Sequence, residues 1–522
     1  MNQETSSRWY MATRDDSRVA RHLYGGKIDR AHSLEEDALL DEFFAYLKDI
    51  GVWEELEQFR PQKVKRVLVP FIRFLLLYML QILFSIESTN ALPDLLLTDQ
   101  AAMKLIGFNA YQIKNGVCKR GEYKRTNTDR EPVNRGPIAP ETIPDNMAKP
   151  TMDEILGLFN SSIRKLAKWG AFPEEVSLTA DATDMETTEK FDGCGKAIRK
   201  KRVTDKTGQE KIIEVVVYGW KLIVLMEQTT KIPVAATVVK IQKHESSYLL
   251  GLVEQAKQNL KGYAWIDEVL IDRGFLDGED LYKLSQMGIH FVILGKEGMR
   301  VVKEARELAA QATQGKEEVG LHVAKEGEGR KEVEVVGIEG LRCYDQYGPP
   351  GHGDKKYRND FKPNLINGGV VRKWAGRDYG PGGKRVYLTN MKVNRPLKIY
   401  HTYNNRSTIE NSLNKETKQS WNLEDAPKKC EESVVNHGIY TLFVFGLVKG
   451  FHLWKEDQEA KELGGKRWRR RLIKQNRDQV IIFSKGNYGI FEINEALILA
   501  GARERDSPLK GREEIMKKYR NL

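Results

Sequence analysis

Apolar residues recur with a helical period through the first part of the chain. In the stretch LEEDALLDEFFAYLKDIGVWEELEQF, residues 34–59, they fall at intervals of three and four, and Pro61 separates this stretch from a largely apolar run at 67–86. An arginine and a glutamine interrupt that run, which leaves far fewer than the roughly 18 uninterrupted apolar residues of a membrane span. We therefore predict a helical domain over 1–118 with a buried helix at 67–86, and keep a membrane-anchored protein as an alternative.

A group of prolines ends this helical pattern. Residues 119–150 contain five prolines among many charged residues and show little apolar periodicity, which predicts a linker or an extended arm. Thr151 and Glu154 then have the spacing of a capping box, in which each side chain bonds the other residue's backbone N–H. A helix is therefore expected to begin at Thr151.

The pattern beyond that helix is typical of strands. A short apolar segment ends at Asp181, and two long β-branched runs follow at 211–226 and 231–241. A helix, a strand around Asp272, a second helix and a strand at 290–296 complete the series. Three strands, helix, strand, helix, strand predicts an α/β unit with a five-stranded sheet flanked by helices.

The remainder of the chain has three different patterns. Residues 297–396 begin with a helical piece and continue as short strands among glycine-rich turns, which predicts a β-rich insertion. A polar helix near Thr402 and an apolar helix at 432–453 follow, and residues 455–522 are basic. We expect the α/β unit to combine 151–296 with 397–454.

Composition and charge limit the class of protein and its partners. The balance of 40% hydrophobic and 30% charged residues is that of a folded globular protein, and the net charge of +11 favours a polyanion as partner, either nucleic acid or an acidic membrane surface. The four cysteines lie far apart without the spacing of a zinc site, and the N-terminus lacks the pattern of a secretion signal. We expect a cytoplasmic protein.

Three carboxylates have positions that call for an explanation. Asp272 lies within an apolar strand, where an unpaired charge would cost several kcal/mol. Its neighbour Arg273 is a poor partner, because successive strand residues point to opposite faces of a sheet. Asp181 alone is equally consistent with a turn cap, and Glu410 alone with an ordinary helix surface.

Taken together, these three carboxylates suit a metal site. Two strands and a helix can bring them to one edge of a sheet, and oxygen ligands of this kind hold Mg²⁺. Two such ions about 3.5 to 4 Å apart can activate an attacking oxygen and stabilise a leaving oxygen in phosphoryl transfer. A basic surface would then hold the DNA backbone.

The helix that carries Glu410 presents further polar residues on the same face. Tyr403, Arg406, Glu410 and Thr417 fall within roughly 40° of one line along a helix. An arginine fork and a phenol on this face suit contacts to phosphate oxygens. Helix packing for Tyr403 and a surface ion pair for Arg406 are the alternatives.

The motifs in their order resemble the DDE transposases of bacterial insertion sequences. They are Asp181 followed by Ala-Thr, the strands YGWKLIVLM and IPVAATVVKI, VLIDRGF around Asp272, and Tyr403-x-x-Arg406-x-x-x-Glu410. The similarity is closest to insertion-sequence group four, whose third acidic residue lies in a Tyr, Arg, Glu, Lys signature. It covers roughly residues 151–454.

The resemblance implies an RNase H-like catalytic core, a mixed sheet of five strands flanked by helices, with a β-rich insertion. It also implies a cut-and-paste transposase activity. It assigns Asp181, Asp272 and Glu410 to a site for two Mg²⁺ or Mn²⁺ ions, and Tyr403 and Arg406 to phosphates of the transposon end. It also implies that the partners are terminal inverted repeats and target DNA, bound by a homodimer.

The signature lysine is displaced in this chain. The family pattern places it seven residues after Glu410, where this chain has Thr417. Lys418 lies about 80° from Glu410 around a helix and Lys415 about 140°, so Lys418 is the better substitute.

Other candidates for DNA contact are less specific. Trp374, among several basic residues of the insertion, could stack on a displaced base or pack against the sheet. The tract KRWRRRLIK, with Lys466, Arg467, Arg469 and Arg470, could bind phosphates or form a solvated turn. The helical domain over 1–118 is expected to bind DNA, and the basic C-terminal region could bind DNA or dimerise. Lys221 could face DNA or pair with a carboxylate of the core, whereas His244 and Glu245 could approach the metal site or cap the helix that they begin. A non-catalytic DNA-binding repressor derived from a transposase is the alternative function.

Overall fold

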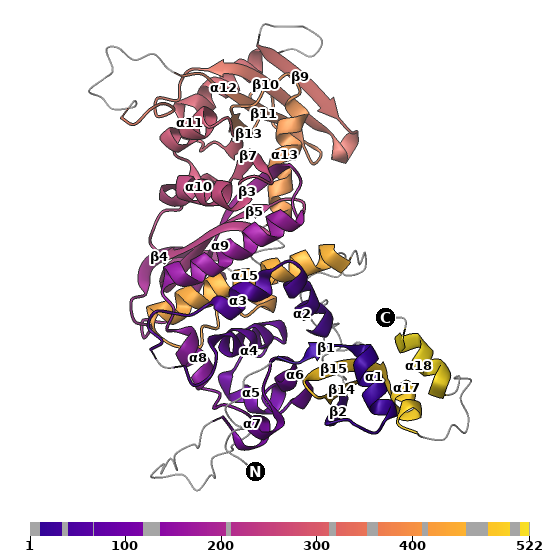
Figure 1. Cartoon of the computed structure of the whole chain (residues 1–522). Helices are drawn as coiled ribbons and strands as arrows, with labels where there is room; N and C mark the ends of the chain where they lie inside the picture. Colours follow the sequence, from indigo (N-terminus) through magenta and orange to yellow (C-terminus); the bar gives the residue numbers. More distant parts are fainter. Residues whose placement is uncertain are drawn as a thin grey trace. The chain divides into compact units, whose positions relative to one another are not determined.

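The structure is a computed structural model, and it describes residues 11–33, 40–65, 67–117, 136–204, 210–312, 320–351, 364–409, 416–455, 479–501 and 512–520. The chain divides into two compact units, and Figure 1 draws both with most of their elements labelled. The first unit contains 1–158, 420–437 and 454–522, and the second contains 159–419 and 438–453. Both units are therefore discontinuous in sequence.

A single mixed sheet forms the centre of the second unit. Its strands follow the order β4-β5-β3-β7-β8-β13-β11-β10-β9, while β6 also pairs with β5 and β12 with β11. The predicted mixed α/β class is thereby confirmed. The strands are β3 (Glu175–Thr187), β4 (Gly195–Thr204), β5 (Glu210–Glu227), β6 (Pro233–Lys240), β7 (Trp265–Ile271), β8 (His290–Leu294), β9 (Leu321–Glu326), β10 (Val333–Leu341), β11 (Ile366–Trp374), β12 (Arg377–Asp378) and β13 (Arg385–Thr389).

Strand direction changes at β3. This strand is antiparallel to β5 and parallel to β7, which is in turn parallel to β8, and β6 is antiparallel to β5. Strand β4, which the sequence pattern did not predict, forms a long antiparallel pair with β5. Helix α10 (Leu249–Leu260) connects β6 to β7, and helix α11 (Gly278–Gln286) connects β7 to β8.

The strands expected to form an insertion continue this same sheet. Antiparallel pairing of β13 with β8, with Tyr387 opposite Leu294, joins β9–β13 to the preceding strands. Helix α12 (Arg300–Gln311) packs on β10, β11 and β13, and α13 (Pro396–Ile409) packs on β7–β11. Buried side chains such as Val335, Val371 and Ile399 fill the space between the strands and α13.

Helices make up most of the first unit. The apolar run at 67–86 forms α4 (Phe71–Leu83), in which every residue is buried. The segment predicted to be a linker contains a further helix. The other helices here are α2 (Leu40–Asp49), α3 (Val52–Gln58), α5 (Leu92–Leu95), α6 (Gln100–Leu105), α7 (Ala110–Asn115) and α8 (Thr142–Met147).

A second, four-stranded sheet joins the two ends of the chain within this unit. Its order is β1-β15-β14-β2, and it corrects the expectation of an all-helical region over 1–118. Strands β1 and β2 have two and four residues, too few to show a period in the sequence. We call this sheet with its helices the terminal module: β1 (Thr13–Arg14), α1 (Asp16–Tyr24), β2 (Arg30–Ser33), β14 (Gln479–Ser484), β15 (Asn487–Glu492), α17 (Ile493–Leu499) and α18 (Arg512–Arg520).

Two long helices contain residues of both units. Helix α9 (Met152–Trp169) begins with the predicted capping box, in which Thr151 Oγ1 accepts from Glu154 N at 3.2 Å and Glu154 Oε2 accepts from Thr151 N at 2.7 Å. Helix α15 (Glu431–Lys455) is long and apolar enough to cross a membrane by length and composition alone. Because 94% of its apolar window is buried within the protein, it equally fits a core helix.

The described cysteines Cys194, Cys343 and Cys430 are free thiols, and Cys118 lies outside the described residues.

Candidate active site

Asp181 lies in the middle of β3. The sequence pattern predicted that it ends a strand, but β3 continues to Thr187 and pairs with β5 over that whole length. Only 8% of Asp181 is exposed, and its Oδ1 accepts a hydrogen bond from Ala182 N at 2.8 Å. This bond holds the carboxylate in one orientation on the strand.

Asp272 directly follows β7. It was expected inside the strand, but β7 ends at Ile271, and Asp272 is the N-cap residue of the short helix η4 (Arg273–Phe275). Its side chain is 42% exposed, so the cost of burying a charge no longer needs an explanation. Arg406 Nη1 of α13 lies 3.8 Å from Asp272 Oδ1.

The strand register brings the two aspartates together. Ala180 of β3 is paired with Ile271 of the parallel strand β7, so the next residue on each is an aspartate. Neighbouring strands lie about 4.8 Å apart, and equivalent positions of a parallel pair point to the same face. Asp181 and Asp272 therefore form a pair of carboxylates between adjacent strands.

The third predicted carboxylate, Glu410, lies outside the described residues. Helix α13, which would carry it, is described as far as Ile409, its last residue. Within the described ranges no group of three His, Cys, Asp or Glu side chains is placed to hold a metal ion. The donors that are described, two carboxylates, are of the hard-oxygen type that suits Mg²⁺.

Tyr403 and Arg406 project from α13 toward Asp272. Tyr403 is 8% exposed, its ring centroid lies 4.8 Å from that of Tyr387, and burial raises the pKa of its phenol. The Arg406 guanidinium carbon lies 5.4 Å from the centroid of the Tyr403 ring. The tyrosine therefore packs in the core of the sheet and supports the arginine beside the aspartate.

A cavity of about 630 Å³ opens beside Asp272. Asp272, Tyr403 and Arg406 contribute to its wall, together with residues that follow β8 and residues of β13. The wall is rich in cations, which suits a polyanion. They are Arg273, Lys296, Arg306, Lys384, Arg385 and Arg406.

Trp374, at the end of β11, lies close to one of these cations. The guanidinium carbon of Arg385 is 4.1 Å from the centroid of the indole ring, and the ring packs against the buried cluster that includes Tyr403. One face of Trp374 is therefore covered by an arginine. This contact does not test the predicted stacking on a DNA base.

Lys418 reaches the same strand as Asp181. It lies on α14 (Glu416–Ser420), and its ammonium group donates to the backbone carbonyl of Asp184. Three residues along a strand are about 10 Å, so this contact places Lys418 near the carboxylate pair without joining it. The other predicted basic residues, Lys415, Lys466, Arg467, Arg469 and Arg470, lie outside the described residues.

A buried ion pair lies behind η4. Lys221 Nζ of β5 is 2.5 Å from Glu245 Oε1, and the two side chains are 6% and 20% exposed. A Cβ atom added at Gly274 would lie 2.7 Å from Glu245 Oε2, so this carboxylate rests against the turn that carries Asp272. Of the two roles open to Lys221, pairing with a carboxylate of the core is the one that the structure shows.

The wall of the cavity contains functional candidates that the sequence did not single out. Arg306 lies on α12, Lys384 directly precedes β13 and Arg385 is its first residue, and no spacing motif connects the three. Arg273 had an available signal, since it directly follows Asp272. The others become neighbours only through the pairing of β8 with β13.

Comparison with known proteins identifies a family. The family model described as Transposase DDE domain matches residues 174–446, just over half of the chain. Among solved structures, a piggyBac transposase in a synaptic complex with hairpin DNA is similar at 10% identity and a TM-score of 0.36, over 90% of this chain and 81% of that chain. A similarity of that degree supports no inference. No curated protein matches the chain.

Proposed function

The chain belongs to the transposase DDE domain family, and on that premise we propose that it cuts DNA at the ends of an insertion sequence and joins the freed 3′ hydroxyl to target DNA. The observation that carries this proposal is that Asp181 of β3 and Asp272, directly after β7, each follow one of the paired residues Ala180 and Ile271, with a cavity lined by cations beside Asp272. Carboxylates and cations at one place are what metal-dependent phosphoryl transfer on a polyanion requires.

The strand order supports a finer assignment of the fold. We propose that β6, β5, β3, β7 and β8 form an RNase H-like core, because the first three are successively antiparallel and the last two are parallel to β3. The group-four type is proposed from the sequence of α13 and the residue that follows it, with Tyr403, Arg406 and Glu410 in the family's spacing.

We propose that Asp181, Asp272 and Glu410 hold two ions of Mg²⁺ or Mn²⁺. When bound, the ions would activate the attacking oxygen and stabilise the leaving oxygen. The chain's own groups prepare this site: the backbone N–H of Ala182 orients Asp181, and Arg406 offsets the charge of Asp272.

The DNA would be held by the cations around the site. Arg406, supported by the Tyr403 ring, would donate to a DNA phosphate in the cavity. Lys418 and Trp374 would contact the DNA next to that phosphate. The tract with Lys466, Arg467, Arg469 and Arg470 remains a proposed phosphate contact. We further propose a homodimer on paired inverted repeats, acting on target DNA in the cytoplasm.

The direct test is cleavage of a DNA duplex that carries the inverted repeats flanking the gene. Asp181→Asn, Asp272→Asn and Glu410→Gln are each expected to lower the Mg²⁺-dependent nicking rate by at least about 100-fold, because each removes a charged ligand. Asp267→Asn is the matched control, since Asp267 lies on β7 five residues before Asp272. The control is expected to cut at the wild-type rate.

The outcomes separate the two functions considered for this chain. Loss of nicking in the three variants with unchanged end binding supports the transposase. Undiminished cleavage by all three variants would reject the assigned site. End binding by the wild type without nicking in Mg²⁺ or Mn²⁺ would favour a non-catalytic repressor.

A further inference from the structure

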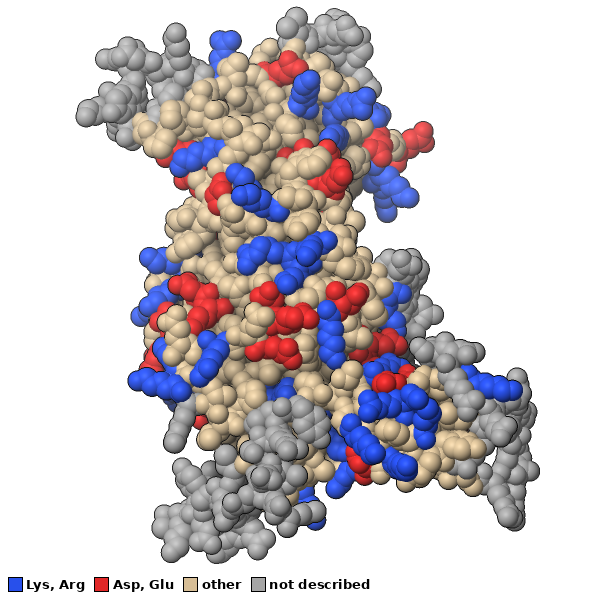
Figure 2. Space-filling view, in the orientation of Figure 1, with Lys and Arg blue, Asp and Glu red and all other residues tan. Residues whose placement is uncertain are grey.

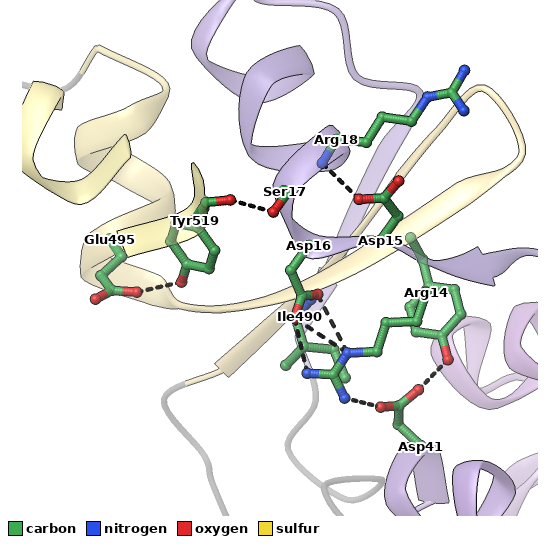
Figure 3. A network of polar contacts seen from close by, with 10 residues as sticks. Arg14, Asp15, Asp16, Ser17, Arg18, Asp41, Ile490, Glu495 and Tyr519 are labelled. Carbon is green, nitrogen blue, oxygen red and sulfur yellow. Dashed lines mark hydrogen bonds and ion pairs between the residues drawn. The ribbon is translucent and has the colours of Figure 1, made fainter. Parts of the chain in front are cut away.

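Asp15 and Asp16 of the terminal module, and Asp41 of α2, bond other groups of the protein. Figure 3 shows Asp16 and Asp41 both paired with Arg14, while Asp16 also accepts from Ile490 N at 3.0 Å and Asp15 caps α1 by accepting from Arg18 N at 2.8 Å. These bonds fasten β1 and α1 to β15 and to α2. The carboxylates in this network are thereby used to hold the two ends of the chain together.

The cations on the outside of the module remain uncovered. Arg18 and Arg21 of α1, Lys27, Arg30 of β2 and Lys485 in the β14–β15 turn are all exposed. Within the described part of the chain none of them has a carboxylate within ion-pair distance. In Figure 2, lysine and arginine side chains gather over the region where Figure 1 places α1, β2, β14 and β15.

Four of these cations lie around one histidine. His22 Nδ1 is 2.9 Å from Ser484 Oγ, which connects α1 to the end of β14. Burial lowers the pKa of His22, and so do the charges of Lys485, Arg18, Arg21 and Lys27. The charges therefore form one continuous surface, although they come from residues that are more than 450 positions apart in sequence.

This surface continues into a cavity of about 740 Å³. Arg30 and Lys114 contribute to its wall, and Lys104 of α6, only 8% exposed, lies there with its ammonium group 4.5 Å from the centroid of the Phe483 ring. Lys104 has no carboxylate within ion-pair distance in the described ranges. Burial and the charge of Arg30 lower its pKa to about 8, against the opposing charge of Asp29 in the same wall, so Lys104 is still a cation at neutral pH.

We propose that this surface, which we call the terminal basic face, binds the phosphate backbone of double-stranded DNA. It consists of Arg18, Arg21, Lys27, Arg30, Lys104, Lys114 and Lys485. Exposed arginines and lysines contact successive phosphates, and the cavity takes one phosphate between Arg30 and Lys104. The proposal rests on the proposed function for the identity of that DNA, the ends of the insertion sequence.

The packing of α1 favours DNA over an acidic membrane. A helix that binds at a membrane interface inserts its apolar face among the lipids. The apolar face of α1, formed by Val19, Ala20 and Leu23, is already buried against Ile482 and Phe491 of the small sheet. The helix therefore presents charge to a partner, and a charged surface without an apolar face suits a DNA backbone.

The test is the salt dependence of DNA binding by the full chain in EDTA, where no metal-dependent cleavage occurs. The triple variant Arg21→Gln, Lys27→Gln, Lys485→Gln removes three exposed charges. Each phosphate contact contributes about 0.9 to the slope of log K against log salt, so we expect the slope to fall by about 2.7. Between 50 and 200 mM salt the wild type should lose about 40-fold more affinity than the variant.

The matched control removes the same charge from another part of the first unit. Lys63→Gln, Lys65→Gln, Lys428→Gln is expected to keep the wild-type slope. Lys63 and Lys428 already pair with Glu432 and Asp145. Lys104→Met tests the cavity separately, because methionine keeps a flexible apolar chain over Phe483. It should lower the slope by about 0.9 with little change in melting temperature.

The results also separate this inference from the proposed function. A reduced slope in the triple and Lys104→Met variants supports the terminal basic face even when the wild type cuts no DNA. An unchanged slope in both variants overturns it, even when the wild type nicks its ends in Mg²⁺. Equal slopes for the triple variant and its control would also overturn it. So would a triple variant that binds DNA like the wild type but has lost binding to vesicles containing phosphatidylserine.

Discussion

Lys221→Met tests how the turn that carries Asp272 is held in place. Lys221 Nζ lies 2.5 Å from Glu245 Oε1 and donates to the carbonyl of Lys243 at 3.1 Å. Methionine keeps the length and apolar stem of lysine but removes its charge. The substitution therefore leaves the Glu245 carboxylate, which is 20% exposed and rests against Gly274, without its cation.

The structure sets the expected magnitude. Removing one member of a fully buried ion pair costs about 3 to 5 kcal/mol, because the remaining charge stays buried and uncompensated. Glu245 retains a fifth of its exposure, so the lower end of that range, about 3 kcal/mol of unfolding free energy, is expected. A cost of this size raises the equilibrium constant for local opening of η4 and β5 by more than about 100-fold.

Native-state hydrogen exchange suits this measurement, because a chain with two units does not unfold in one step. Peptides that cover 219–227 and 270–276 should exchange faster in Lys221→Met, while those of the terminal module should not change. The double variant Lys221→Met, Glu245→Met should recover to within about 1 kcal/mol of the wild type, since apolar side chains of similar volume replace the pair.

Two results would refute this reasoning. A cost below about 1 kcal/mol for Lys221→Met would mean that solvent screens Glu245. A double variant that is as unstable as the sum of the single variants would mean that the lysine and the glutamate act independently.

Two further predictions concern the first unit. His437 is enclosed between Tyr78 Oη and the carbonyl of Asn422, and burial lowers its pKa to about 4. In the unfolded chain the imidazole binds a proton near pH 6.5. The contribution of neutral His437 to the free energy of unfolding is therefore fully present above that pH and is lost as the pH falls toward 4. Between pH 7.5 and 5 the loss should be about 2 kcal/mol of local unfolding free energy, measured by native-state hydrogen exchange of α4, and His437→Gln should remove that dependence. Among the described residues, Arg14→Met leaves Asp41, which is 2% exposed, with the Tyr488 hydroxyl as its side-chain partner. It should cost about 2 to 3 kcal/mol, seen as faster amide exchange in β15 while that of β7 is unchanged.

Local patterns predicted those elements whose stabilising contacts are close in sequence. The capping box at Thr151 depends on residues three apart, and α4 depends on a run of apolar residues, so both could be predicted. Strand β3 was predicted too short, because the polar residues after Ala180 hide its continuation. Pairing with β5 over its full length extends it to Thr187.

Elements that depend on distant partners could not be predicted. Strands β1 and β2 exist because β14 and β15, more than 440 residues away, offer unpaired backbone groups. Asp272 was identified because a charge in an apolar run needs a partner or a cation, and Asp181 because it follows a short apolar run, so neither identification required knowledge of the strand pairing. The cations of the cavity come from separate elements without a common spacing, so only the register of the sheet brings them together.

That register has a consequence for how the candidate active site meets its substrate. The cavity wall includes residues that follow β7 and β8, residues of β13, and residues of α13, which packs on β7 and β8. Gly295 N donates to the carbonyl of Val386 at 2.9 Å, so the backbone bonds between these strands continue to the edge of the cavity. Groups fixed by a hydrogen-bonded sheet need little reorganisation when a substrate binds. The continuation of the sheet through β13 therefore places the cations beside Asp272 before any DNA arrives.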